Sequence, residues 1–153
     1  MKKDEELKDE IKKKYAITLC DPKDIPEDAL WSTRCSRRKS FLKKGFPKEI
    51  YTSPLNQEFY LWEERKGILY GTISDAYGLV MNYQEIETYD LSPDRLSDAA
   101  KRSLGESIGG ECRDLVSFKS LVLYCKDYGE AESYLEILSY SGLKVYWVRR
   151  LLE

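Results

Sequence analysis

The sequence predicts one α/β domain, a three-layer α/β/α arrangement around a mainly parallel sheet of about five strands. Two observations lead to this fold class. Short apolar runs alternate along the chain with amphipathic stretches of 12 or more residues, and strands separated by such stretches are joined by crossover helices in a parallel sheet. The length of 153 residues suits a single domain with a sizeable core.

The predicted strands are the apolar runs, which in chain order are Ala16–Cys20, Ala29–Cys35, Gly67–Ser74, Ser120–Cys125 and Leu143–Val148. A helix is predicted from Ser53-Pro54 to about Lys66, because Ser is a good N-cap and Pro suits the first helical position. Ser92-Pro93 repeats this signal before a second helix, which Gly109-Gly110 is expected to break or end. A third helix is predicted over Gly129–Tyr140.

The N-terminus has a different character from the rest of the chain. Eleven of the first fourteen residues are charged, and Leu7, Ile11 and Tyr15 form one narrow apolar stripe. We therefore divide the chain into a charged helix or arm over residues 1–15 and a single α/β domain over residues 16–153. The arm is either a solvated helix, as charge runs usually are, or a helix that binds a partner.

Composition excludes several classes of function. The chain has no His, so it builds neither a Ser-His-Asp or Cys-His nucleophile nor a His-ligated zinc or haem site. Its four Cys form no CxxC pair, which indicates free thiols in a reducing cytoplasm, with neither a metal nor another cofactor expected. No apolar run has the length of a membrane helix, so no membrane association is expected.

The strongest local signal is a positive segment, Arg34–Lys48. The whole chain has 25 basic and 27 acidic residues, yet this segment has seven basic residues and no acidic one, so the rest of the chain carries −9. The segment begins where a predicted strand ends, which is where α/β sheets bind ligands. It is either a phosphate-binding site for nucleic acid or a nucleotide, or an ordinary surface loop balanced by acidic neighbours.

A second signal, Ser74-Asp75-Ala76-Tyr77-Gly78-Leu79, follows the third predicted strand. Asp75 is placed to contact a ligand or to act as a general acid or base, or else it only forms a turn. Gly78 permits a sharp turn. The Cys35 thiol is either activated by neighbouring arginines, which would lower its pKa, or a buried structural thiol.

Four short motifs occur in order between Ala29 and Asp90, namely Cys35-Ser-Arg-Arg-Lys39, Ile50-Tyr-Thr-Ser-Pro-Leu55, Ile73-Ser-Asp-Ala-Tyr-Gly-Leu-Val80 and Tyr89-Asp90. They resemble the Cys-Ser-Lys-Lys-Lys, Leu-Tyr-Thr-Ser-Pro-Leu-Phe and Leu-Ser-Ala-Lys-Tyr-Gly-Leu-Val motifs of an uncharacterised family that is similar to the peroxide-stress protein YaaA. A related Cys-Ser-Ala-Arg-Lys motif occurs in archaeosine synthase and its relatives, which act on tRNA.

The resemblance implies that the turn after the second strand and the turn after the third form one site. In that site, phosphate would be held by Arg37, Arg38 and Lys39, and hydroxyl donors would come from Ser36 and Ser53. The remaining implied residues are Cys35, Ser74 and Gly78 in the two turns, Tyr51 or Tyr77 against a base or sugar, and Asp75 as the acid or base. The chain departs from the family at Ala76, where relatives have Lys, and at Asn56, where they have Phe.

Three functions are therefore considered. The leading hypothesis is a cytoplasmic domain that binds nucleic acid or a nucleotide through the Cys35–Lys39 and Ser74–Leu79 turns. The second is an enzyme that acts on a nucleoside or nucleobase, with Asp75 as its acid or base. The third is a non-catalytic module that binds a protein partner through the charged arm.

Overall fold

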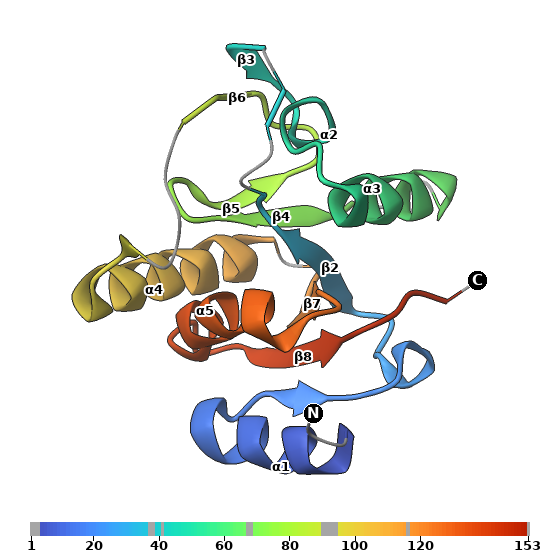
Figure 1. The fold of residues 1–153 in the computed structure, drawn as a ribbon, viewed down its shortest axis with the longest axis vertical. Helices are drawn as coiled ribbons and strands as arrows, with labels where there is room; N and C mark the ends of the chain where they lie inside the picture. Colours follow the sequence, from blue (N-terminus) through green and yellow to red (C-terminus); the bar gives the residue numbers. More distant parts are fainter. Residues whose placement is uncertain are drawn as a thin grey trace.

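A computed structural model describes residues 4–36, 39–40, 42–66, 69–89, 95–115 and 117–152. Its central sheet has six strands in the order β1-β8-β7-β2-β4-β5, and every neighbouring pair is parallel except β4 and β5 (Figure 1). The strands are β1 (Thr18–Leu19), β2 (Ala29–Arg34), β4 (Gly71–Ser74), β5 (Gly78–Met81), β7 (Ser120–Tyr124) and β8 (Lys144–Val148). The predicted mainly parallel sheet is confirmed.

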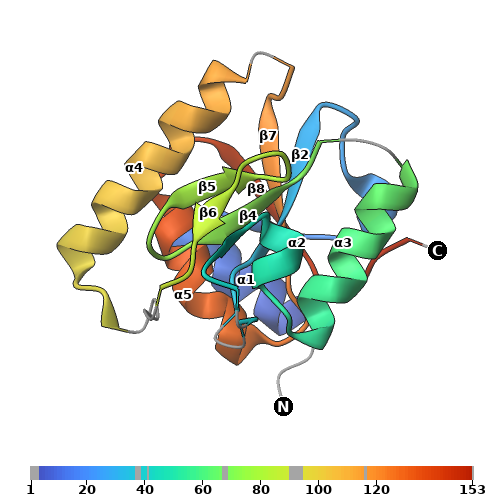
Figure 2. The same ribbon diagram turned by 90° about the horizontal axis from the view of Figure 1, so that it is seen from above.

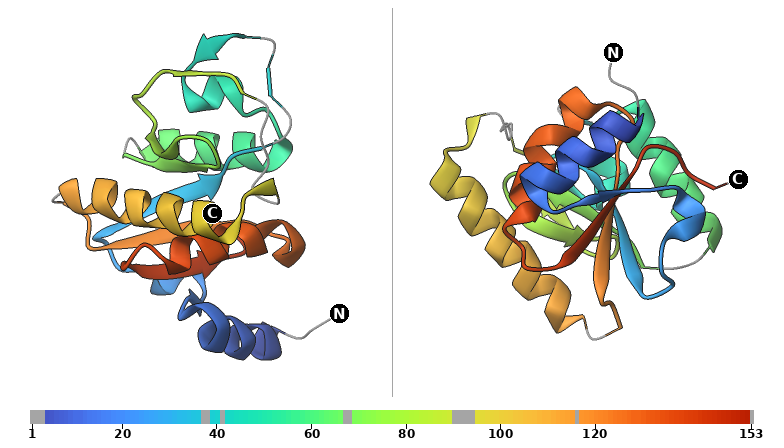
Figure 3. Two further views of the ribbon diagram at one scale, coloured as in Figure 1. Left: turned by 90° about the vertical axis from the view of Figure 1, so that its left-hand side faces the viewer. Right: turned by 90° about the horizontal axis from the view of Figure 1, so that it is seen from below.

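Helices cover both faces of this sheet. The helices α1 (Asp4–Tyr15), α4 (Asp98–Asp114) and α5 (Tyr128–Ser139) lie on one face, and α3 (Pro54–Lys66) lies on the other (Figures 2 and 3). The short helices are η1 (Pro22–Asp24) and α2 (Pro47–Ile50). A separate antiparallel pair, β3 (Lys44–Gly45) and β6 (Ile86–Glu87), lies beyond the β5 end of the sheet. The fold is thus the expected three-layer α/β class.

The strand β5 is the strand of the central sheet that the sequence analysis missed. Asp75–Tyr77 forms a three-residue hairpin turn, and Gly78 pairs with Ser74 as the first residue of β5. Gly78 has a φ of 79°, which glycine adopts without the penalty a side chain would bring. Three-residue hairpin loops need one residue of this kind. The segment after the third predicted strand is therefore the tip of a hairpin, and the sheet gains a sixth strand.

The helix α4 differs from its prediction at both ends. It begins at Asp98 after the N-cap Ser97, whose hydroxyl accepts from the Ala100 N–H at 3.1 Å, whereas Ser92-Pro93 lies outside the described residues. It also runs through Gly109-Gly110 to Asp114, so the prediction that these glycines break or end the helix was wrong. The physical reason is packing, because a Cβ on Gly109 would lie 2.0 Å from the Ser141 carbonyl oxygen.

The charged N-terminal segment is docked on the body of the protein. The stripe Leu7, Ile11 and Tyr15 is buried against the sheet and α5. The Tyr15 hydroxyl donates to Glu132 of α5 at 2.9 Å, and the Lys14 ammonium forms an ion pair with the same carboxylate at 2.9 Å. No helix within the described ranges is long and apolar enough to cross a membrane.

Candidate functional site

The carboxyl ends of the central strands bring the sequence signals together. The chain leaves β2 toward β4 on one side, and β7 later pairs with β2 on the other side. Ligands of open α/β sheets bind where the strand order reverses in this way, beyond the carboxyl ends of the strands. Cys35 and Ser36 follow β2, Asp75 follows β4, and Cys125 follows β7. The candidate site lies at this edge.

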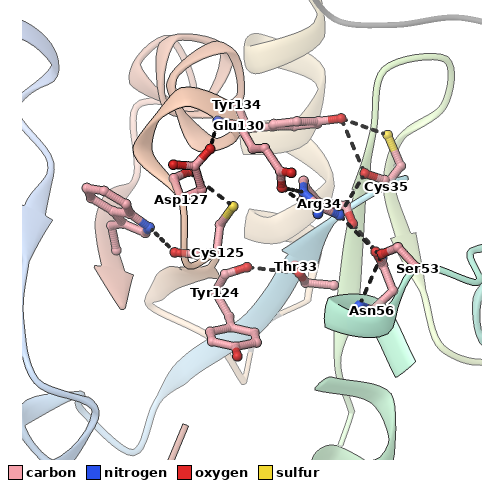
Figure 4. A network of polar contacts seen from close by, with 11 residues as sticks. Thr33, Arg34, Cys35, Ser53, Asn56, Tyr124, Cys125, Asp127, Glu130 and Tyr134 are labelled. Atoms are coloured by element: carbon pink, nitrogen blue, oxygen red, sulfur yellow. Dashed lines mark hydrogen bonds and ion pairs between the residues drawn. The ribbon is translucent and has the colours of Figure 1, made fainter. Parts of the chain in front are cut away.

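Arg34, the last residue of β2, is held by side chains from both helical layers (Figure 4). Its guanidinium donates to Glu130 of α5 at 2.6 and 3.0 Å and to the Asn56 side-chain oxygen of α3 at 2.8 Å. The Asn56 amide in turn donates to the Arg34 carbonyl oxygen at 2.6 Å. Arg34 is 8% exposed, so it fixes α3 and α5 to the end of β2 and is not available to bind phosphate.

Several cations of the positive segment, Arg34–Lys48, are paired with carboxylates in the fold and are therefore not available to a ligand. Besides Arg34, two of its cations form ion pairs, Lys44 with Glu85 at 3.2 Å and Lys48 with Glu64 at 3.0 Å. Lys39 and Lys43 form no ion pair with another described residue. Arg37 and Arg38 lie outside the described residues. The positive charge of Lys39 acts on the Asp75 carboxyl and lowers its pKa against the larger effect of burial.

The two predicted turns are in direct contact. The Cys35 thiol donates to Asp75 Oδ1 at 3.4 Å, although forty residues separate them in the chain. The Tyr134 hydroxyl of α5 lies 3.2 Å from Cys35 Sγ and donates to the Cys35 carbonyl oxygen at 3.4 Å. Cys35 is 3% exposed and Asp75 is 4% exposed. The contact therefore forms a small buried polar cluster at the carboxyl edge of the sheet.

The environment of Cys35 opposes activation of its thiol. Burial and the charge of Asp75 raise the pKa of Cys35 to about 11. Of the arginines expected to lower this pKa, Arg34 directs its guanidinium to Glu130 and Asn56, and Arg37 and Arg38 lie outside the described residues. Among the two interpretations of Cys35, the buried structural thiol fits the structure.

Asp75 occupies an environment that disfavours its charge. Burial raises the pKa of Asp75, while the nearby Tyr89 hydroxyl, the Cys35 thiol and the Lys39 ammonium act in the opposite direction. Asp75 Oδ2 is buried and has no hydrogen-bond partner among the described residues. Within the described residues, this carboxyl accepts a hydrogen bond from the Cys35 thiol at Oδ1.

Tyr89 connects the cluster to Lys39 and Tyr77. Its hydroxyl lies 2.6 Å from the Tyr51 hydroxyl and 2.7 Å from Ser74 Oγ. Its ring contacts the Tyr77 ring edge-to-face, with centroids 5.3 Å apart, and the Lys39 ammonium lies 4.7 Å from its ring centroid. Tyr77 is 42% exposed and Tyr51 is fully buried. Of the two tyrosines expected to pack a base or sugar, only Tyr77 presents a ring to solvent.

The other predicted site residues have structural partners. Ser74 Oγ accepts from the Ala76 and Tyr77 N–H groups at 3.2 and 3.0 Å, which shapes the hairpin turn with Gly78. Ser36 is buried beside the cluster. The Ser53 hydroxyl donates to the Asn56 side-chain oxygen at the start of α3, so the structure uses it to anchor that helix.

Sequence reasoning missed four residues that build this edge, namely Asn56, Tyr89, Glu130 and Tyr134. For Tyr89 a signal existed, because Tyr89-Asp90 is one of the family-like motifs. For Glu130 and Tyr134 there was none, since they lie on a helix more than ninety residues beyond their partners on the β2 turn.

A cleft of about 260 Å³ lies farther along the same edge, at the ends of β1 and β8. Its two arginines are neutralised within it, Arg149 by Asp4 at 2.9 Å and Arg150 by Asp21 at 2.5 Å.

Within the described ranges, no group of three or more Cys, Asp or Glu side chains is arranged to hold a metal ion. No family model, curated protein or solved structure matches this chain.

Proposed function

We propose that this domain binds a phosphate-bearing ligand, a nucleotide or nucleic acid, between the Cys35–Lys39 and Ser74–Leu79 turns. The observation that carries the proposal is the contact between the turns, in which Cys35 Sγ lies 3.4 Å from Asp75 Oδ1. Two segments with independent sequence signals meet at the edge where α/β sheets bind ligands. If the positive segment were an ordinary surface loop, there would be no reason for it to contact the Asp75 turn.

Lys39 is the described residue best placed to contact the phosphate. Its ammonium packs on the Tyr89 ring and has no carboxylate partner in the described chain, whereas Arg34, Lys44 and Lys48 are neutralised by ion pairs. A cation held against an aromatic face keeps donors free for an anion. Arg37 and Arg38 add positive charge to the same turn in the sequence.

Binding is favoured over catalysis by the titration behaviour of the cluster. Burial raises the pKa of Tyr51, Tyr89 and Tyr134, and it raises that of Cys35 to about 11. These groups hold their protons, which leaves Asp75 as the one carboxyl among the described residues of the cluster, without a second described group to complete an acid–base pair. A partner-binding arm is also less favoured, because the apolar stripe of α1 is already buried.

Substitution of Lys39 tests the proposal. We expect Lys39→Ala to weaken binding of a nucleoside 5′-monophosphate, measured by isothermal titration calorimetry, by about tenfold, the cost of one charge-assisted hydrogen bond. For a fluorescent single-stranded oligonucleotide, the same change should reduce the slope of log K against log[salt] by about 0.7. Comparing the two probes also separates a nucleotide site from a nucleic-acid site.

Lys44→Ala is the matched control, because it removes the same charge from the same segment. Lys44 lies on β3, is 62% exposed at its side chain and pairs with Glu85. We expect the affinity of the Lys44→Ala variant for both probes to stay within about twofold of that of the wild type, because most surface ion pairs contribute little free energy. Equal losses in both variants would show only a general charge effect and would contradict a site at Lys39.

A further inference from the structure

The Tyr77 ring combines exposure to solvent with a fixed position. The Tyr77 N–H donates to Ser74 Oγ at 3.0 Å inside the hairpin turn, and the hydroxyl donates to the Glu87 carbonyl oxygen at 2.9 Å. The Tyr89 ring stands at 84° to it, and a neighbour at that angle covers at most one ring face. Tyr77 is still 42% exposed. A flat ligand therefore reaches this ring directly from solvent, and no cavity is needed.

Two lysines lie along the segment that Tyr77 contacts. The Lys39 ammonium lies 4.7 Å from the centroid of the Tyr89 ring, which in turn contacts Tyr77. The carbonyl oxygen of Lys43 accepts from the Thr88 N–H at 2.9 Å, and Thr88 adjoins both residues that the Tyr77 side chain contacts. Neither lysine forms an ion pair with another described residue. The exposed ring and the two lysines therefore belong to one short stretch of surface.

The acidic side chains of this region are associated with a third lysine. Glu85 pairs with Lys44 at 3.2 Å, and Glu87 lies opposite Lys44 in the register of β3 and β6. Lys43 extends the same ladder by one residue, through its bond to Thr88. Because successive residues of a strand face opposite sides, Lys43 faces away from Lys44 and its acidic neighbours. An exposed aromatic ring among cations is the arrangement by which proteins bind single-stranded nucleic acid.

We propose that the ligand is single-stranded nucleic acid, with one unpaired base stacked on Tyr77 and successive phosphates at Lys39 and Lys43. This inference rests on the proposed function and selects one of its two ligands. A mononucleotide has a phosphate for only one of the lysines. A duplex keeps its bases stacked inside and has none to place on the ring. Every base has an aromatic face, so the site accepts any base but requires one.

Wild-type protein and matched oligomers test this inference. The probes are a short fluorescent oligothymidylate, the same strand paired with its complement, and an abasic oligomer of equal length, compared by fluorescence anisotropy at fixed pH and salt. We expect the single strand to bind at least about fivefold tighter than either of the others, the lower end of what one stacked base contributes. Oligouridylate is measured beside them, and the tighter of the two single strands identifies DNA or RNA as the source. Equal or tighter binding of the duplex or the abasic oligomer would overturn the inference.

Substitution of Tyr77 separates stacking from charge. Tyr77→Leu should weaken oligothymidylate binding by at least about fivefold and leave the abasic oligomer unaffected, because only the stacked base is lost. Tyr77→Phe is the matched control, since it keeps the ring and removes only the hydroxyl, and we expect it to bind more tightly than Tyr77→Leu. Thermal unfolding is checked on each sample, and if Tyr77→Leu does not fold, the wild-type comparison decides. Unchanged affinity in a folded Tyr77→Leu variant would contradict the stacking.

Lys43→Ala tests whether the site spans more than one nucleotide. This variant should weaken oligothymidylate binding by about fivefold and leave the affinity for thymidine 5′-monophosphate within about twofold of the wild type. Equal losses for both probes would contradict a second phosphate position. Binding of phosphate-bearing probes that depends on Lys39 but shows no preference for an unpaired base would refute this inference and spare the proposed function. Failure of every phosphate-bearing probe would refute both.

Discussion

The side chain of Glu63 lies on the inner face of α3, fully shielded from solvent, and neither of its carboxylate oxygens has a hydrogen-bond partner among the described residues. Burial raises the pKa of Glu63 to about 8, and the nearby Lys66 opposes this only in part. In the unfolded chain the pKa returns to about 4.3. Between these two values the folded protein binds a proton that the unfolded chain does not.

This difference fixes the sign of a pH effect on stability. The contribution of protonated Glu63 is complete below about pH 4.3 and is lost as pH rises through about 8, so the free energy of unfolding should fall across that window. Glu63→Gln keeps the shape and removes the titration. We expect the variant to be more stable than the wild type by at least about 1 kcal/mol at pH 9, measured by urea denaturation.

Glu64→Gln is the control at the next position. Glu64 is partly exposed and pairs with Lys48, so Glu64→Gln removes a carboxyl from the same helix without changing the buried position. A pH profile of unfolding for Glu63→Gln that ran parallel to that of the wild type would refute the buried ionisable state of Glu63.

At the scale of elements, the packing of α4 on α5 depends on two glycines. A Cβ at Gly105 would lie 2.1 Å from the Ile137 carbonyl oxygen, and a Cβ at Gly109 would lie 2.0 Å from that of Ser141. Both obstacles are backbone atoms, which cannot move aside as a flexible side chain would. Close approach of the two helices therefore explains why a glycine-containing segment remains helical.

Alanine substitution separates this packing role from helix propensity. We expect Gly109→Ala to lower the free energy of unfolding by about 1–3 kcal/mol through overpacking. Gly110→Ala should instead raise it by about 0.5–1 kcal/mol, because nothing lies within 4 Å of its Cβ position and alanine favours the helix. Denaturant unfolding of both variants measures the difference. A stabilising Gly109→Ala would contradict the observed helix contact.

The elements were predictable where local rules decide them. Ser53-Pro54 starts α3 as its cap and proline signal indicated, and the buried runs that became β2, β7 and β8 needed only their apolar pattern. The strand β5 and the length of α4 were not predictable in this way. The strand β5 depends on the pairing of Gly78 with Ser74 across a tight hairpin turn, and the length of α4 depends on the close approach of Gly109 to Ser141, 32 residues away.

At the scale of the whole molecule, the sequence indicated which edge of the sheet holds the candidate site. It did not indicate which charged side chains at that edge are paired with one another. Arg34 was counted among the seven cations of the positive segment, yet it is buried and paired with Glu130, which is 96 residues away. Only the fold brings such partners together. The contact between Cys35 and Asp75 agrees with the expectation that the two turns lie side by side, whereas the orphaned oxygen of Asp75 had no sequence signal.

The central claim is that these two turns form one ligand site. The main alternative binding site is the cleft at the ends of β1 and β8. The most direct test is a titration of ¹⁵N-labelled protein with cytidine 5′-monophosphate, followed by backbone amide chemical shifts. The account predicts that the largest changes occur together at Ser36, Lys39 and residues 75–77. Changes centred on Cys20, Asp21 and Arg149, or none at millimolar nucleotide, would contradict it.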